Sequence, residues 1–106
     1  MIRAVYHREQ NKIVIEGHAY SGEPGHDLIC ASASMLVYTL AASVESMEKH
    51  GHISGAVIDL KEGNGVVGCE AYEQFKAAIT LIFDSICAGY ELLAVNYPEN
   101  VSYEIK

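Results

Sequence analysis

Residues 17–34 read GHAYSGEPGHDLICASAS and join a segment typical of a β-strand to a segment typical of an α-helix. Two histidines, an aspartate, a cysteine and three glycines lie in this stretch, and no other part of the chain concentrates reactive groups and flexible backbone so strongly. Gly22, Pro24 and Gly25 interrupt regular structure, so we expect a loop between the two elements. The elements on either side of this junction decide the fold.

A β-hairpin is expected before the junction. Residues 2–6 and 13–15 are short β-type runs, and Asn11-Lys12 suits the turn between them. The second strand is expected to continue to about Ala19, before the loop residues end it. The chain therefore opens with two adjoining antiparallel strands.

A helix is expected directly after the junction, from about Cys30 to Lys49. Its apolar residues recur at steps of three and four, which places them on one helical face; they are Met35, Leu36, Leu40, Val44 and Met47. Asp27 lies just ahead of this helix as its natural N-cap, and Gly51 supplies the backbone freedom of a C-cap. The helix therefore begins beside the loop.

The second half of the chain predicts another hairpin, another helix and a last strand. The expected elements are strands at residues 53–61 and 65–71, a helix from Glu70 to about Tyr97, and a strand at residues 101–105. The hairpin turn falls on residues 62–64, and Pro98 ends the helix. The helix carries a wide apolar stripe, made of Phe75, Ile79, Ile82, Phe83, Ile86, Tyr90 and Leu93.

The expected order is therefore β-β-α-β-β-α-β. Two long helices with apolar stripes bury those stripes together when both lie on one face of a sheet. We expect an α+β fold, a two-layer sandwich with a mostly antiparallel sheet and both helices packed on one face. With 106 residues, the chain is expected to form a single domain, residues 1–106.

Charge limits the classes of partner. Seven basic and fourteen acidic residues give a formal net charge of −7. Binding of nucleic acid relies on clustered Lys and Arg, so we expect no direct nucleic-acid partner. A basic segment of a partner protein would be attracted by this charge.

The cellular compartment is inferred from the N-terminus and the cysteines. Residues 1–7 lack the apolar core of a signal peptide, and no apolar run approaches the roughly 20 residues that span a bilayer. The three cysteines form no C-x-x-C pair, so neither a disulfide framework nor a zinc ribbon is indicated. We expect reduced thiols, a cytoplasmic location and no membrane partner.

Cys30 is the candidate nucleophile. A helix N-terminus favours a thiolate through its macrodipole and free N–H groups, and Cys30 lies where the sequence places such a terminus. The alternative is a small hydrophobic residue buried in the first turn. Core packing is the preferred interpretation for the other two cysteines, Cys69 and Cys87.

His18 is the candidate general base. It lies near the end of the second strand, where Gly17 and Ala19 leave space around the ring, and it could take the thiol proton and return it to a leaving amine. The alternatives are a partly exposed strand histidine without a chemical role, or His26 as the base. Asp27 could orient a histidine, although capping is preferred.

Other chemistries receive less support from the sequence. Ser34 lies one helical turn beyond Cys30, where it could hydrogen-bond a substrate or simply pack. His18, His26 and Cys30, together with His50 or His52, offer zinc-ligand types but not a zinc-binding spacing. We expect no metal and no cofactor.

The motif G-H-A, followed by G-x-D-x-x-C-A-x-x-S, resembles the signature of the bacterial ribosomal-processing cysteine proteases, the Prp family. It is formed by residues 17–19 and 25–34. The resemblance extends to the chain length and the order of strands and helices. It implies a cytoplasmic cysteine endopeptidase, usually homodimeric, that removes an N-terminal extension from a large-subunit ribosomal protein after a hydrophobic segment ending in aromatic residues.

By motif position, the resemblance makes Cys30 the nucleophile and His18 the catalytic histidine. Asp27, Ser34 and Gly17 become positions that support the site or contact the substrate. Gly22 and Gly25 would allow the loop to open for an extended peptide and close over it. The competing hypothesis is a non-catalytic module, such as a ribosome-assembly factor, that uses the same loop only to bind a peptide.

Overall fold

The structure is a computed structural model that describes residues 1–18 and 26–106. Its strands are β1 (Ile2–His7), β2 (Lys12–Glu16), β3 (Ile53–Lys61), β4 (Asn64–Ala71) and β5 (Val101–Ile105). Its helices are α1 (His26–Lys49) and α2 (Lys76–Asn96), with short 3₁₀ turns η1 (Arg8–Gln10) and η2 (Glu73–Phe75). The order of elements confirms the sequence prediction.

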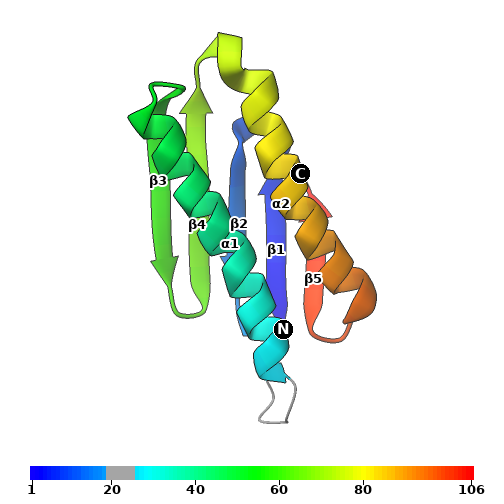
Figure 1. Ribbon diagram of the computed structural model, residues 1–106. Helices are drawn as coiled ribbons and strands as arrows, with labels where there is room; N and C mark the ends of the chain where they lie inside the picture. Colours follow the sequence, from blue (N-terminus) through cyan, green and yellow to red (C-terminus); the bar gives the residue numbers. More distant parts are fainter. Residues whose placement is uncertain (19–25) are drawn as a thin grey trace.

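The five strands form one mixed sheet in the order β3-β4-β2-β1-β5. All neighbours are antiparallel except β1 and β5, which run parallel. Both helices lie side by side across one face of this sheet (Figure 1). The α+β fold with two layers is therefore confirmed.

The face that α1 turns to the sheet is offset from the predicted one. Its buried side chains are Ile29, Ala33, Val37, Leu40, Ala41, Val44 and Met47. Met35, predicted to be in the core, is 64% exposed. It lies two residues from both Ala33 and Val37, about 200° around the helix from each, so it cannot share their face. The stripe predicted for α2 is confirmed, with Ile79, Phe83 and Tyr90 buried.

Both helices begin at positions other than those predicted. α1 starts at His26, so Asp27 lies within its first turn and the predicted N-cap is wrong. α2 starts at Lys76 instead of Glu70, because β4 continues to Ala71, where it pairs with Ile53. Gly51, at φ 74°, follows the end of α1, and His52 donates to the carbonyl of Met47 at 2.9 Å, as in a Schellman C-cap.

By length and composition, residues 28–49 and 73–96 are apolar enough to cross a membrane. The statement that no apolar run approaches that length was therefore too strong. Both helices pack a buried stripe against the sheet, and core helices of this kind pass the same test. The expectation that the chain has no membrane partner stays a prediction.

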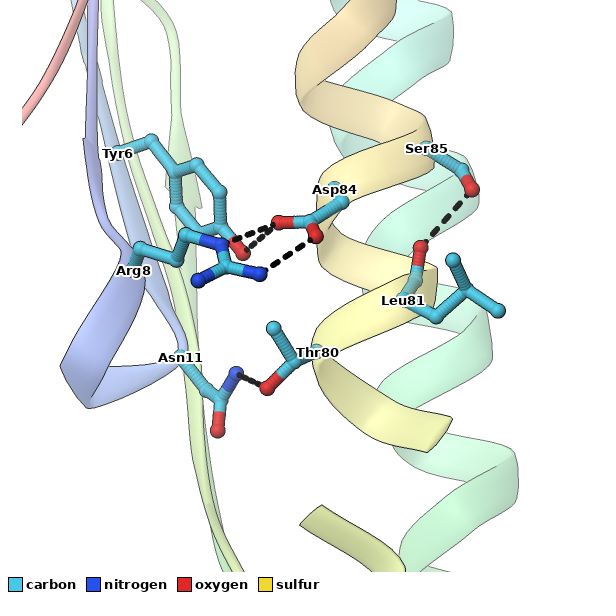
Figure 2. A network of polar contacts seen from close by, with 7 residues as sticks. All are labelled: Tyr6, Arg8, Asn11, Thr80, Leu81, Asp84 and Ser85. Carbon is cyan, nitrogen blue, oxygen red and sulfur yellow. Dashed lines mark hydrogen bonds and ion pairs between the residues drawn. The ribbon is translucent and has the colours of Figure 1, made fainter. Parts of the chain in front are cut away.

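A polar network joins α2 to the first hairpin, at the end of the sheet where β1 finishes (Figure 2). Tyr6 donates to Asp84 at 2.8 Å, and the Arg8 guanidinium donates two hydrogen bonds of 3.0 Å to the same carboxylate. Asn11, buried and in the left-handed region at φ 48°, donates to Thr80 at 3.0 Å. These contacts fix α2 against β1 and the turn that follows it, whereas the start of α1 lies at the end of the sheet that carries His18.

Candidate active site

Gly17 ends β2 and places His18. The strand stops at Glu16, short of the predicted end at Ala19, because Gly17 adopts φ 90° and turns out of the sheet. Its N–H donates to the carbonyl of Gly63 in the β3–β4 turn at 2.8 Å. A Cβ at Gly17 would collide with the carbonyl oxygen of Met1, so only glycine fits this bend.

His18 follows immediately and its side chain is exposed. The imidazole lies against Gly63: a Cβ built on that glycine would stand 2.7 Å from Nε2 of His18. The β3–β4 turn therefore contacts both the backbone before His18 and the ring itself. The sequence predicted the turn of a hairpin at residues 62–64 and no role for it in the site.

Cys30 is the fifth residue of α1 and is half-buried, packed against the edge of the core. Helical side chains tilt toward the N-terminus, which brings the thiol over the first turn. Ser34 stands one turn further along the same face and is exposed. The interpretation of Cys30 as a packing residue is therefore partly right, since one side of it meets the core.

His18, Cys30, Ser34 and Gly17 all line one open pocket of about 450 Å³. The end of β2, the start of α1 and the β3–β4 turn meet at this end of the sheet (Figure 1). The apolar lining consists of Ile2, Ile15, Ala33, Val37 and Leu60. The structure thus places the imidazole of His18, the thiol of Cys30 and the hydroxyl of Ser34 in one pocket with an apolar lining.

Five pocket residues come from the β3–β4 turn, residues 61–65, and were missed in the sequence. Tyr38 of α1, 56% exposed, was missed as well. The available signal was the glycine-rich tract Gly63-Asn64-Gly65, which in the sequence predicted only the position of the hairpin turn. In the structure, Gly63 of this tract lies beside the His18 ring and has no side chain to displace it.

Some predicted site features lie outside what the structure describes. Gly22 and Gly25, predicted to gate the site, fall in the undescribed residues 19–25. His26 and Asp27 belong to α1, but their side chains are not described. Apart from the N-cap role of Asp27, which the start of α1 excludes, the roles predicted for these four residues stay predictions.

Two larger hollows, of about 580 and 700 Å³, lie near η1 and the start of α2. The described residues that line them include no histidine and a single thiol, that of Cys69. Among the described residues, no group of three or more His, Cys, Asp or Glu side chains is placed to hold a metal ion. Of the pockets lined by the described residues, the one that holds His18 and Cys30 combines a histidine with a thiol.

A family model described as "Cysteine protease Prp" matches residues 1–102. The chain belongs to the Prp family. Membership places the chain among proteases, and the family's name implies a cysteine mechanism. No curated protein sequence matches the chain.

Solved structures share the fold over nearly the whole chain. SMU.848 from Streptococcus mutans is 28% identical, with a TM-score of 0.69, covering 99% of this chain and 93% of that chain. The ribosomal processing protease Prp from S. aureus, solved with a substrate peptide, is 18% identical, with a TM-score of 0.72 and coverages of 99% and 97%. The same protease with a covalently linked product peptide is 21% identical, with a TM-score of 0.70 and coverages of 99% and 97%.

The three thiols of this Prp family member occupy different environments. Burial raises the pKa of Cys69, and it raises the pKa of Cys87 to about 12. Both side chains are buried, whereas Cys30 reaches the pocket surface. Core packing of Cys69 and Cys87 is confirmed, and Cys30 is the accessible thiol of the chain.

Proposed function

We propose that this Prp family member is a cysteine endopeptidase that removes the N-terminal extension of a large-subunit ribosomal protein. Cys30 is the nucleophile and His18 the general base and acid. The observation that carries the proposal is that both side chains, delivered by separate elements, line one pocket. His18 follows β2 in the sheet and Cys30 lies in α1, so each layer of the fold contributes one of these side chains to the pocket.

The chemistry follows from this placement. His18 accepts the thiol proton, and the Cys30 sulfur attacks the scissile carbonyl to form a tetrahedral intermediate. His18 then donates the proton to the leaving amine, and water resolves the acyl-enzyme. The first turn of α1 carries N–H groups without intrahelical acceptors, and such donors contribute about 3–4 kcal/mol each when they bind an oxyanion.

The form of the pocket supports a peptide as substrate. Its apolar lining suits a hydrophobic side chain beside the scissile bond, and its opening admits an extended segment. The S. aureus protease was solved with a substrate peptide and with a covalently linked product peptide, which supports the same substrate class here. The net charge of −7 would attract the basic body of a ribosomal protein.

A cleavage assay tests the proposal. The wild-type protein is incubated with a peptide that spans the extension and the mature N-terminus of the ribosomal protein, alongside Cys30→Ala and Cys30→Ser. We expect the wild type alone to cut, while both variants still bind the peptide. Cys69→Ala is the matched control, because it removes a buried thiol away from this pocket and should leave cutting intact.

The rival hypothesis predicts a different result. A non-catalytic peptide-binding module would bind the peptide equally well with and without the Cys30 thiol, and none of the proteins would cut it. That pattern, obtained with a correctly folded wild type, would overturn the proposed function.

A further inference from the structure

Gly63 makes two contacts with the segment that carries the proposed base. Its carbonyl oxygen accepts the N–H of Gly17 at 2.8 Å, which fixes the backbone directly before His18. The His18 imidazole lies close beside its backbone: a Cβ built at this position would lie 2.7 Å from Nε2 and 3.3 Å from Cε1 of His18. One residue of the β3–β4 turn thus contacts both the backbone of Gly17, directly before the proposed base, and the ring of His18.

We propose that Gly63 is a positioning residue for His18, and that its missing side chain sets where the imidazole lies in the pocket. The role rests on the proposed function of His18 as general base and adds a residue to it. Gly63 does not itself take part in proton transfer. It acts by offering a backbone surface on which the ring can lie.

A side chain at residue 63 would displace the imidazole ring of His18. Ordinary van der Waals contact begins at 3.4 Å, so a Cβ at 2.7 Å from Nε2 requires a displacement. The atom in the way is the far end of the His18 side chain, which moves more readily than the hairpin backbone. A shift of about 1 Å restores normal contact. A displacement of that size in a catalytic group lowers the rate by as much as about 100-fold.

Gly51 provides a matched control for backbone strain. Gly63 has φ 79° and Gly51 has φ 74°, so an alanine is strained to a similar degree at either position. A Cβ at Gly51 meets nothing within 4 Å, and Gly51 follows the opposite end of α1 from Cys30. Gly63→Ala and Gly51→Ala therefore share the strain and differ in the contact with His18.

The test compares both variants with the wild type in two measurements. Long-range ¹H–¹⁵N spectra report the His18 ring nitrogens, assigned by their loss in His18→Gln. Steady-state cleavage of the junction peptide reports kcat and KM over a range of pH. For Gly63→Ala we expect displaced His18 ring signals, kcat/KM lowered about 10- to 100-fold, and an altered pH profile. For Gly51→Ala we expect wild-type values throughout.

The two measurements separate this inference from the proposed function. Unchanged His18 ring signals in a folded Gly63→Ala variant would overturn the positioning role, whatever the cleavage rate. Equal losses in both alanine variants would also overturn it, since strain alone would then explain them. A wild type that cuts no peptide would refute the proposed function, while the ring signals would still decide whether Gly63 places His18.

Discussion

The phenol of Tyr90 in α2 donates a 2.6 Å hydrogen bond to the main-chain carbonyl of Ala33 in α1. Tyr90 is fully buried, and Ala33 is itself a pocket residue that lies between Cys30 and Ser34 on that helix. The second helix therefore fixes the turn of α1 that presents the proposed nucleophile. Packing between the two helices therefore also positions the part of α1 that carries Cys30 and Ser34.

Tyr90→Phe should lower the free energy of unfolding by about 1 kcal/mol. The substitution removes the hydroxyl and keeps the ring, so it isolates the hydrogen bond. Denaturant titration measures the change, and Tyr38→Phe is the control, because Tyr38 is 56% exposed. If the two variants prove equally stable, the bond from Tyr90 to Ala33 contributes nothing.

Asp84 makes the stability depend on pH. The Arg8 guanidinium hydrogen-bonded to Asp84 holds the pKa of that carboxyl below its usual range, and Tyr6 acts in the same direction. A carboxylate with a lowered pKa in the folded state stabilises above its unfolded pKa of about 3.9, and this contribution is lost as the pH falls through the folded pKa. The difference in unfolding free energy between wild type and Asp84→Asn should therefore shrink below about pH 4.

Unfolding titrations between neutral pH and acid measure this difference. Asp59→Asn serves as control, because Asp59 and its partner Lys61 are both exposed and surface pairs contribute little. A constant difference between wild type and Asp84→Asn across the whole range would contradict the assigned role of the carboxylate.

The fold was predictable because its signals are local. Apolar periodicity marks both helices, and glycines mark the turns at Gly51 and Gly63. The errors arose where contacts between residues far apart in the sequence determine where an element ends. β2 ends at Glu16, well before the glycines at 22 and 25, because Gly17 bends against Met1 and hydrogen-bonds to Gly63.

From the sequence, only the part of the site formed by the junction of β2 and α1 was predictable. The junction between β2 and α1 places His18 and Cys30 near each other along the chain, and the motif names them. The opposite wall depends on strand register: β2 pairs with β4 so that Glu16 faces Asn64, which carries residues 61–65 to the side of His18. No local pattern specifies that register, so the contribution of Gly63 was visible only in the structure.

Gly17→Ala should destabilise the protein by at least about 1–2 kcal/mol, the usual cost of an L-residue in a left-handed conformation. Its Cβ would also collide with the carbonyl of Met1. Gly55→Ala in β3 is the matched control, because its Cβ meets nothing within 4 Å. Thermal and denaturant unfolding measure the change. Equal stability of the two variants would show that the bend at Gly17 tolerates a side chain.

His18→Ala should abolish peptide cleavage and leave the fold intact, since the His18 side chain is exposed. Circular dichroism checks the fold, and a chromatographic assay measures the product. His26→Ala tests the alternative base and should retain activity. The opposite pattern, with His26→Ala inactive and His18→Ala active, would transfer the role of base to His26.

Cys30 should react with iodoacetamide faster than Cys69 or Cys87 near neutral pH. Alkylation requires an accessible thiolate, and burial both shields the other two thiols and raises their pKa, to about 12 for Cys87. Peptide mapping by mass spectrometry after short exposures gives the rate at each cysteine, and unfolding in denaturant provides the reference in which all three react alike. In the folded protein, equal labelling of the three thiols would remove the physical basis for Cys30 as nucleophile. Selective labelling that slows when His18 is replaced by alanine would link the thiol to its proposed base.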